Sequence, residues 1–169
     1  TTVSLWLVDL VTGQVRAQVA EYNGQIARGE DVISRIMYAS KNGGGQDLRD
    51  RVLDTINHLA EIACKRVNAK PENIVKATIA GNSTMMHLLL GIPAGSIRLS
   101  PFVTVVNHPP VLAAHDVGLN INPEASADCL PGVASYVGAD ITAGVLSSGL
   151  DVAEDITLFL DVGTNGEIV

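Results

Sequence analysis

Residues 74–90 read IVKATIAGNSTMMHLLL, and this stretch decides the class of fold. Residues 74–80 predict an extended strand, a glycine-containing turn follows, and residues 85–90 predict a short helix. Ser83 or Thr84 is the expected cap of that helix, and direct ligand contact by the same turn is the alternative. A strand, a turn and a capped helix of this kind form the ligand-facing edge of an α/β sheet.

The chain before this stretch predicts a β-hairpin and two helices. Residues 3–10 predict a strand buried on both faces, and residues 14–20 alternate polar and apolar side chains as a half-buried strand does. A short helix is expected after its cap, Asp31. A longer helix follows, because apolar residues recur at helical spacing over 48–67, with Asp47 as the expected cap.

The chain after this stretch is less periodic. Residues 92–124 contain five of the seven prolines, which predicts a long connection and not a core element. Residues 135–146 predict a helix rich in small residues. Its Gly138 and Gly144 would let a neighbouring backbone approach closely.

This order of elements predicts an α/β fold in two unequal parts. We expect a middle α/β lobe over residues 1–105, a connecting segment over 106–124, and the start of a second lobe over 125–169. One terminal pair of strands is too small to form a stable domain alone. The chain is therefore expected to be a fragment of a longer protein, or its parts pair with each other across the connection.

The final residues, 158–169, read LFLDVGTNGEIV and carry the strongest functional signal. A strand ends in Asp161, and a turn containing Gly163 and Gly166 follows, whose backbone N–H groups can form a concave anion site. A carboxylate beside such a site favours a metal-bridged phosphate, which indicates a Mg-nucleotide. The alternative is a simple hairpin with an Asn165–Gly166 type I′ turn, and the two interpretations are compatible.

Composition excludes several classes of function. The formal net charge is −7 and no cluster of Lys and Arg appears, so nucleic-acid binding is not expected. No apolar run is long enough for a membrane span, and the start shows no secretory signal, so we expect a cytoplasmic protein. Cys64 and Cys129 have no metal-ligating neighbours at usable spacing. Met85, Met86 and His87 predict core packing, with a metal or corrin contact as the weaker alternative.

Four ordered motifs resemble one known family. Residues 23–36 read NGQIARGEDVISRI, residues 80–91 read AGNSTMMHLLLG, residues 137–140 read VGAD, and residues 161–169 read DVGTNGEIV. Together they are similar to signatures of the reductive activators of corrinoid proteins. Because the matches are spread over nearly the whole chain, they are far more specific than any single motif.

The resemblance implies a fold, an activity and partners. In that family a ferredoxin-like domain with a 2Fe-2S cluster precedes a middle domain and a C-terminal domain of the acetate and sugar kinase/heat-shock chaperone/actin superfamily, whose lobes are ribonuclease H-like. It implies Mg-ATP-dependent reduction of a Co(II) corrinoid protein to Co(I), which restores a corrinoid-dependent methyltransferase. This chain would cover the middle domain and the start of the C-terminal one, without the cluster. A homodimer is left open.

The resemblance also assigns a candidate site. Thr1 and Thr2 look like the end of one phosphate-binding turn, although their hydroxyls also suit an ordinary strand. The turn after Asp161 looks like the second, with Asp161 holding Mg²⁺ through water. The implied nucleotide-binding residues are Thr1, Thr2, Asp161, Gly163, Thr164, Asn165, Gly166 and Glu167.

Two other functions stay open on the sequence. A small-molecule kinase of the same superfamily would use the same phosphate-binding turns and would need a base placed on its substrate. A non-catalytic module could instead grip the corrinoid protein without any nucleotide. Because the fragment lacks cluster ligands and half of the nucleotide cleft, we expect it to be inactive alone.

Overall fold

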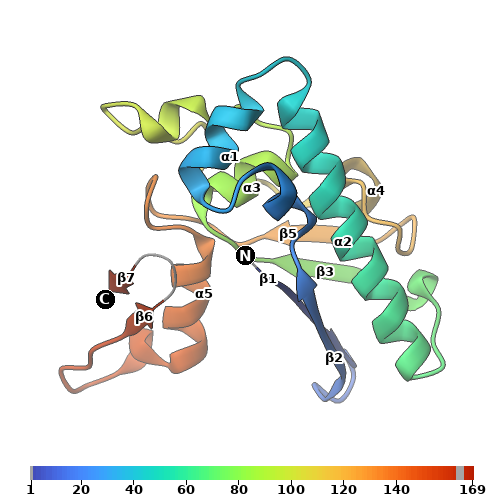
Figure 1. The fold of residues 1–169 in the computed structure, drawn as a ribbon. Helices are drawn as coiled ribbons and strands as arrows, with labels where there is room; N and C mark the ends of the chain where they lie inside the picture. Colours follow the sequence, from blue (N-terminus) through green and yellow to red (C-terminus); the bar gives the residue numbers. More distant parts are fainter. Residues whose placement is uncertain (1, 163–165) are drawn as a thin grey trace.

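The computed structural model describes residues 2–162 and 166–169 and shows a mixed α/β protein (Figure 1). In chain order, with η marking a 3₁₀ helix, its elements are β1 (Thr2–Val8), β2 (Val15–Tyr22), η1 (Gly24–Arg28), α1 (Val32–Ala39), α2 (Gly44–Arg66), η2 (Pro71–Asn73), β3 (Lys76–Ile79), α3 (Ser83–Leu89), η3 (Gly95–Arg98), β4 (Leu112–Ala113), α4 (Ala114–Val117), β5 (Ser126–Cys129), α5 (Ala139–Ser148), η4 (Leu150–Val152), β6 (Leu160–Val162) and β7 (Gly166–Ile168). Within these residues, no helix is long and apolar enough to cross a membrane. The predicted α/β class is confirmed.

Strands β1 and β2 form the predicted hairpin. They pair antiparallel, and the connection turns at Gly13, whose φ of 71° suits glycine. The expectation that β1 is buried on both faces is wrong. Leu5 is half-buried on the side of helix α2, whereas Trp6 on the other face is 53% exposed. The reason is that α2 covers only one face of this two-stranded sheet.

Helix α1 begins as predicted, and α2 begins earlier than predicted. Asp31 caps α1 by accepting a hydrogen bond from the Ser34 N–H at 2.7 Å. Helix α2 begins at Gly44, so Asp47 lies inside it and not at its cap. The Asp47 carboxylate instead accepts hydrogen bonds from Arg28 at 2.8 Å and from the Tyr38 hydroxyl at 2.9 Å. These bonds lower the pKa of Asp47 to about 2.

The second sheet has the order β3-β5-β4. Strand β5 pairs parallel with β3, in a register that places Lys76 opposite Ser126, and β4 pairs antiparallel with β5. Parallel neighbours of this kind need a crossover connection of a dozen residues or more. The two parts of the chain therefore pair with each other across the predicted connection, which was one of the two outcomes expected.

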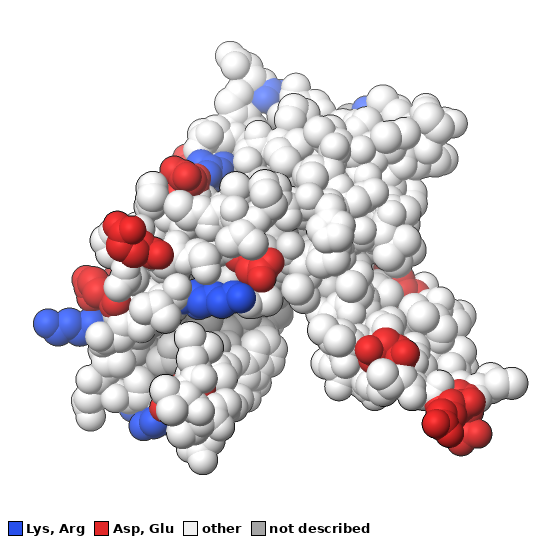
Figure 2. Space-filling view, turned by 180° about the vertical axis from the view of Figure 1, so that it is seen from behind, with Lys and Arg blue, Asp and Glu red and all other residues white. Residues whose placement is uncertain are grey.

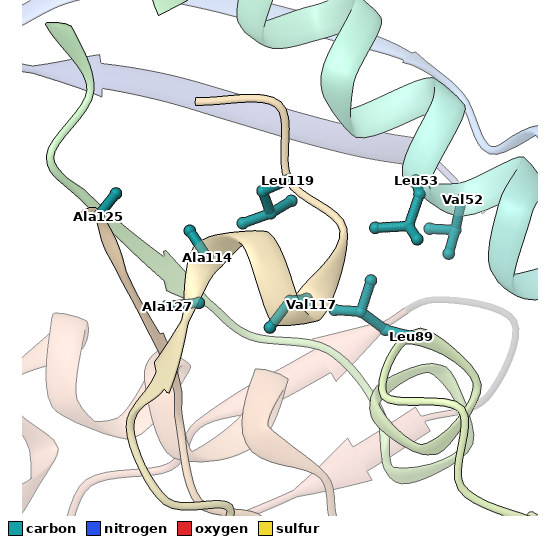
Figure 3. Packing of buried hydrophobic residues seen from close by; sticks show 8 residues of the cluster. All are labelled: Val52, Leu53, Leu89, Ala114, Val117, Leu119, Ala125 and Ala127. Atoms are coloured by element: carbon teal, nitrogen blue, oxygen red, sulfur yellow. The ribbon is translucent and has the colours of Figure 1, made fainter. Parts of the chain in front are cut away.

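The expectation that residues 92–124 contain no core element is wrong. Strand β4 and helix α4 lie inside this range, and Ala114 and Val117 are almost completely buried. Figure 3 shows them with Leu119 among the other buried side chains of the main hydrophobic cluster. The sequence did not reveal these elements, because β4 and α4 are both too short to show periodicity and lie in a proline-rich segment. The division of the chain at residues 105 and 124 stays a prediction.

The C-terminal part consists of α5 and the β6–β7 hairpin (Figure 1). Helix α5 begins at Ala139, later than the predicted start at residue 135, because Ala134 and Val137 form a β-bridge immediately before it. The close approach at Gly144 is to the side-chain ring of Phe159 and not, as predicted, to a neighbouring backbone. A Cβ on Gly144 would lie 2.5 Å from that ring, so the glycine lets α5 contact the segment before β6.

Candidate functional site

The candidate site lies at the edge where the parallel strands β3 and β5 end. Helix α3 begins four residues after β3, and α5 begins ten residues after β5. Because parallel strands deliver their carboxyl ends to the same edge of a sheet, the first turns of both helices lie there (Figure 1). This edge is the usual place for a ligand in an α/β sheet.

Asn82 forms the first part of this edge. Its side-chain oxygen accepts a hydrogen bond from the Met85 N–H at 2.9 Å, so Asn82 caps α3, and the assignment of that cap to Ser83 or Thr84 is wrong. The Ser83 hydroxyl instead donates to the Ala134 carbonyl at 2.7 Å. Ser83 thus connects α3 to the segment that leads into α5.

Gly138 brings the starts of α3 and α5 into direct backbone contact. A Cβ placed on Gly138 would lie 2.5 Å from the Cα of Asn82 and 2.7 Å from the backbone nitrogen of Ser83. The Ala139 N–H also donates to the Gly81 carbonyl at 3.0 Å. The close backbone approach predicted for Gly138 is therefore confirmed, and the partner is the turn after β3.

Asp140 lies in the first turn of α5 and is half-buried. One carboxylate oxygen accepts a hydrogen bond from the Ile141 N–H at 3.0 Å. Burial raises the pKa of Asp140 and so does the nearby charge of Asp161, while the bond from Ile141 lowers it. Asp140 therefore lies close enough to Asp161 for the charge of that carboxylate to act on it.

Asp161 lies in β6, directly opposite Glu167 of β7. Opposite residues of an antiparallel pair project from the same face with Cβ atoms about 5 Å apart, and two like charges there repel each other. The predicted hairpin is confirmed by its two strands, with Gly166 at the start of β7. Its turn residues, Gly163, Thr164 and Asn165, lie outside the described residues, and so does Thr1.

Thr2 is the remaining candidate residue. It is exposed at the start of β1, where it pairs in register with Tyr22 of β2. Figure 1 shows that β1 begins on the side of the sheet where β3 ends. Thr2 is therefore an exposed strand residue, and its role toward phosphate stays a prediction.

Charge is distributed unevenly over the chain. All eleven Lys and Arg residues precede residue 99, so the sequence from 99 onward contains acidic residues but no Lys or Arg. Figure 2 shows the projecting part of the molecule with only acidic charge on the visible face. The acidic residues of this half are Asp116, Glu124, Asp128, Asp140, Asp151, Glu154, Asp155, Asp161 and Glu167. A phosphate bound to this half would need a cation to neutralise it.

The available acidic side chains limit the kind of cation site that could form here. The residues that the structure describes contain no group of three His, Cys, Asp or Glu side chains able to hold a metal ion alone. Mg²⁺ is commonly held by one or two carboxylates, with phosphate oxygens and water as its other ligands. The assignment of Asp161 as a ligand of Mg²⁺ through water stays a prediction.

His87 does not belong to the site. It is fully buried, with Nδ1 2.6 Å from the Ser83 carbonyl, and Nε2 accepts the Val105 N–H at 3.0 Å. Both ring nitrogens are therefore occupied, and Met86 beside it is buried in a hydrophobic cluster. The core interpretation of this Met-Met-His run is confirmed.

Comparisons with known proteins agree on one family. The family model described as "RACo middle region" matches residues 1–153. The chain is 35% identical over 171 residues to "Corrinoid activation enzyme RamQ" of Eubacterium limosum. The aligned region covers 99% of this chain and 28% of that protein. A solved structure, "Reductive activator for corrinoid,iron-sulfur protein", is 46% identical with a TM-score of 0.97 over 99% of this chain and 27% of that one.

The chain therefore spans little more than a quarter of the length of the relatives that it matches. The resemblance inferred from the four motifs is confirmed by all three comparisons. With a family model matched over most of its length, this chain belongs to the RACo middle region family.

Proposed function

We propose that this chain is the part of a corrinoid reductive activator that couples nucleotide to reduction of the corrinoid. Family membership over residues 1–153 supports the corrinoid role, because the named relatives are activators of corrinoid proteins. The observation that supports the nucleotide role is the β6–β7 hairpin that holds Asp161, a carboxylate whose charge, after burial, also raises the pKa of Asp140 in the first turn of α5. The lobe would then be ribonuclease H-like, of the actin and sugar-kinase type.

The residues of this chain would bind and orient Mg-ATP. Asp161 would hold Mg²⁺ through water, and the turn of residues 163–166 would present N–H and hydroxyl groups to the phosphates. Glu167, which pairs opposite Asp161, would position a water molecule. Thr1 and Thr2 would contribute to a second phosphate-binding turn, completed by residues outside this chain.

The redox step would use a domain outside this chain. A 2Fe-2S cluster in that domain would supply the one electron that reduces Co(II) of the bound corrinoid protein to Co(I), and an external electron donor would reduce the oxidised cluster again. A nucleotide can drive this only as far as it binds one arrangement of the protein more tightly than another. The cytoplasmic location and the homodimer stay predictions.

The proposal is tested by replacing Asp161 in the full-length protein. We expect Asp161→Ala to lower the rate of Mg-ATP-dependent Co(II) reduction by at least about a hundredfold, followed by the absorbance of the corrinoid partner. Asp54→Ala is the matched control, because Asp54 is an exposed acid on α2, and it should retain the full rate. An unchanged rate in Asp161→Ala, with both variants folded, would refute the nucleotide assignment.

A further inference from the structure

Two segments that are far apart in the sequence expose apolar side chains on the same side of the molecule. One is the loop 99–107 after η3, and the other is the segment 132–137 before α5 (Figure 1). Single exposed apolar residues are common on protein surfaces, but a contiguous group of them marks an interaction site. Six side chains, each between 46% and 65% exposed, form what we call the apolar patch: Leu99, Phe102, Val103, Val105, Val133 and Tyr136.

Direct contacts join the two segments into one surface. The rings of Phe102 and Tyr136 pack with their centroids 5.8 Å apart. The Ser135 hydroxyl donates a hydrogen bond to the Phe102 carbonyl, and the Asn107 side-chain amide donates to the Val133 carbonyl at 3.3 Å. The apolar patch is therefore a single built surface and not a set of scattered residues.

The loop holds Phe102 in an unusual backbone conformation. Its φ is 60°, in the left-handed region that a residue with a bulky side chain rarely adopts. The Phe102 N–H donates to the Leu99 carbonyl at 2.6 Å, and the bond from Ser135 fixes the Phe102 carbonyl. Strained residues cluster where ligands and partners bind, and a surface shaped in advance has a lower entropic cost of binding. These features are those of a preformed docking surface.

Charge limits the kind of partner that the apolar patch can bind. Residues 99–115 and 129–139 contain no Asp, Glu, Lys or Arg. Nucleic acids and anionic lipid surfaces are bound mainly through Lys and Arg, so neither matches this surface. An uncharged surface with aromatic side chains is typical of the core of a protein–protein interface. The patch therefore fits another protein.

Hydrogen bonds connect the apolar patch to the candidate site. The Val105 N–H donates to Nε2 of His87 in α3 at 3.0 Å, and the Ser83 hydroxyl at the start of α3 donates to the Ala134 carbonyl at 2.7 Å. The start of α3 is itself in backbone contact with the start of α5. Two sites can affect each other through packed and hydrogen-bonded elements of this kind. A protein docked on the patch would thus rest on the same helices that form the candidate site.

We propose that the apolar patch is the docking surface for the corrinoid protein, an inference that rests on the proposed function. A nucleotide can act on the corrinoid protein only if that protein touches elements linked to the nucleotide site, and the patch meets this requirement. A second copy of the chain has no such requirement. Phe102 and Tyr136 are the anchors of the interface, because aromatic side chains at the centre of an interface carry much of the binding energy.

The affinity of the full-length protein for the Co(II) corrinoid protein, measured without nucleotide, gives the first test. We expect Val103→Asp to weaken this affinity about tenfold or more, because docking would bury an unpaired carboxylate. Val11→Asp is the matched control, since Val11 is 95% exposed in the turn between β1 and β2, and it should bind like the wild type. Both variants should fold, because both positions are exposed, and both should bind Mg-ATP as the wild type does.

The outcomes separate this proposal from the proposed function. Equal affinity of Val103→Asp and the wild type for the corrinoid protein would show that the patch is not the docking surface, while the corrinoid role would stand. A wild type that binds no corrinoid protein would end the corrinoid role and this proposal together. Neither measurement depends on the nucleotide assignment of Asp161.

Photo-crosslinking shows what lies on the apolar patch in the complex. Val133 is 65% exposed, so a benzophenone amino acid at this position should leave the core undisturbed. We expect mass spectrometry to find crosslinks to the corrinoid protein. Crosslinks only to other parts of the same molecule, or only to a second copy of it, would show that another surface covers the patch and would overturn the proposal.

Discussion

At the scale of single residues, His87 is a buried titratable group whose protonation state is fixed by its partners. The Ser83 carbonyl requires a proton on Nδ1, and the Val105 N–H requires a lone pair on Nε2, so the ring is neutral. Burial lowers the pKa of His87 below the usual value of 6.5. As the pH falls through 6.5, the unfolded chain takes up a proton that the folded protein does not accept, and stability is lost.

We therefore predict that His87 makes the protein less stable in mild acid. The free energy of unfolding should fall below pH 6.5, approaching about 1.4 kcal/mol per pH unit from this group. Urea unfolding at pH 7.5 and 5.5 measures the effect. His87→Gln should lower stability at pH 7.5 and reduce the loss between the two pH values, whereas His58→Gln, at an exposed position, should behave like the wild type. Equal pH dependence in His87→Gln and the wild type would contradict the assignment of a neutral ring.

At the scale of elements, the site depends on the contact between the starts of α3 and α5. Gly138 has φ −90°, which any residue adopts, so the requirement for glycine is purely steric. We predict that Gly138→Ala destabilises the protein by about 1–3 kcal/mol, because the added methyl group overlaps the backbone of Asn82. Thermal unfolding of the variant measures this loss.

Gly45→Ala is the matched control for that substitution. Gly45 lies in α2, and a Cβ there would meet its nearest neighbour at an ordinary 3.8 Å. Replacing glycine by alanine inside a helix stabilises it by up to about 1 kcal/mol. The two variants should therefore change the melting temperature in opposite directions, and a Gly138→Ala protein as stable as the wild type would contradict the close approach.

At the scale of the whole molecule, the sequence predicts what is local and misses what is long-range. The β-hairpin, the cap at Asp31 and the strand before Gly81 follow from turn chemistry and periodicity, and the structure confirms them. The parallel pairing of β3 with β5 and the burial of Ala114 depend on contacts distant in sequence, and no local pattern encodes them. The contact of Gly138 with Asn82 is long-range in the same sense, although the small residues around Gly138 gave a partial signal of a close approach.

The central claim at this scale is that Asp161 and the turn that follows it bind a magnesium nucleotide. Its most direct test is calorimetric titration of Mg-ATP into the full-length protein and into Asp161→Ala. We predict saturable binding to the wild type that requires Mg²⁺, and affinity weaker by about tenfold or more in the variant. Equal affinity of the two proteins for Mg-ATP would contradict the account.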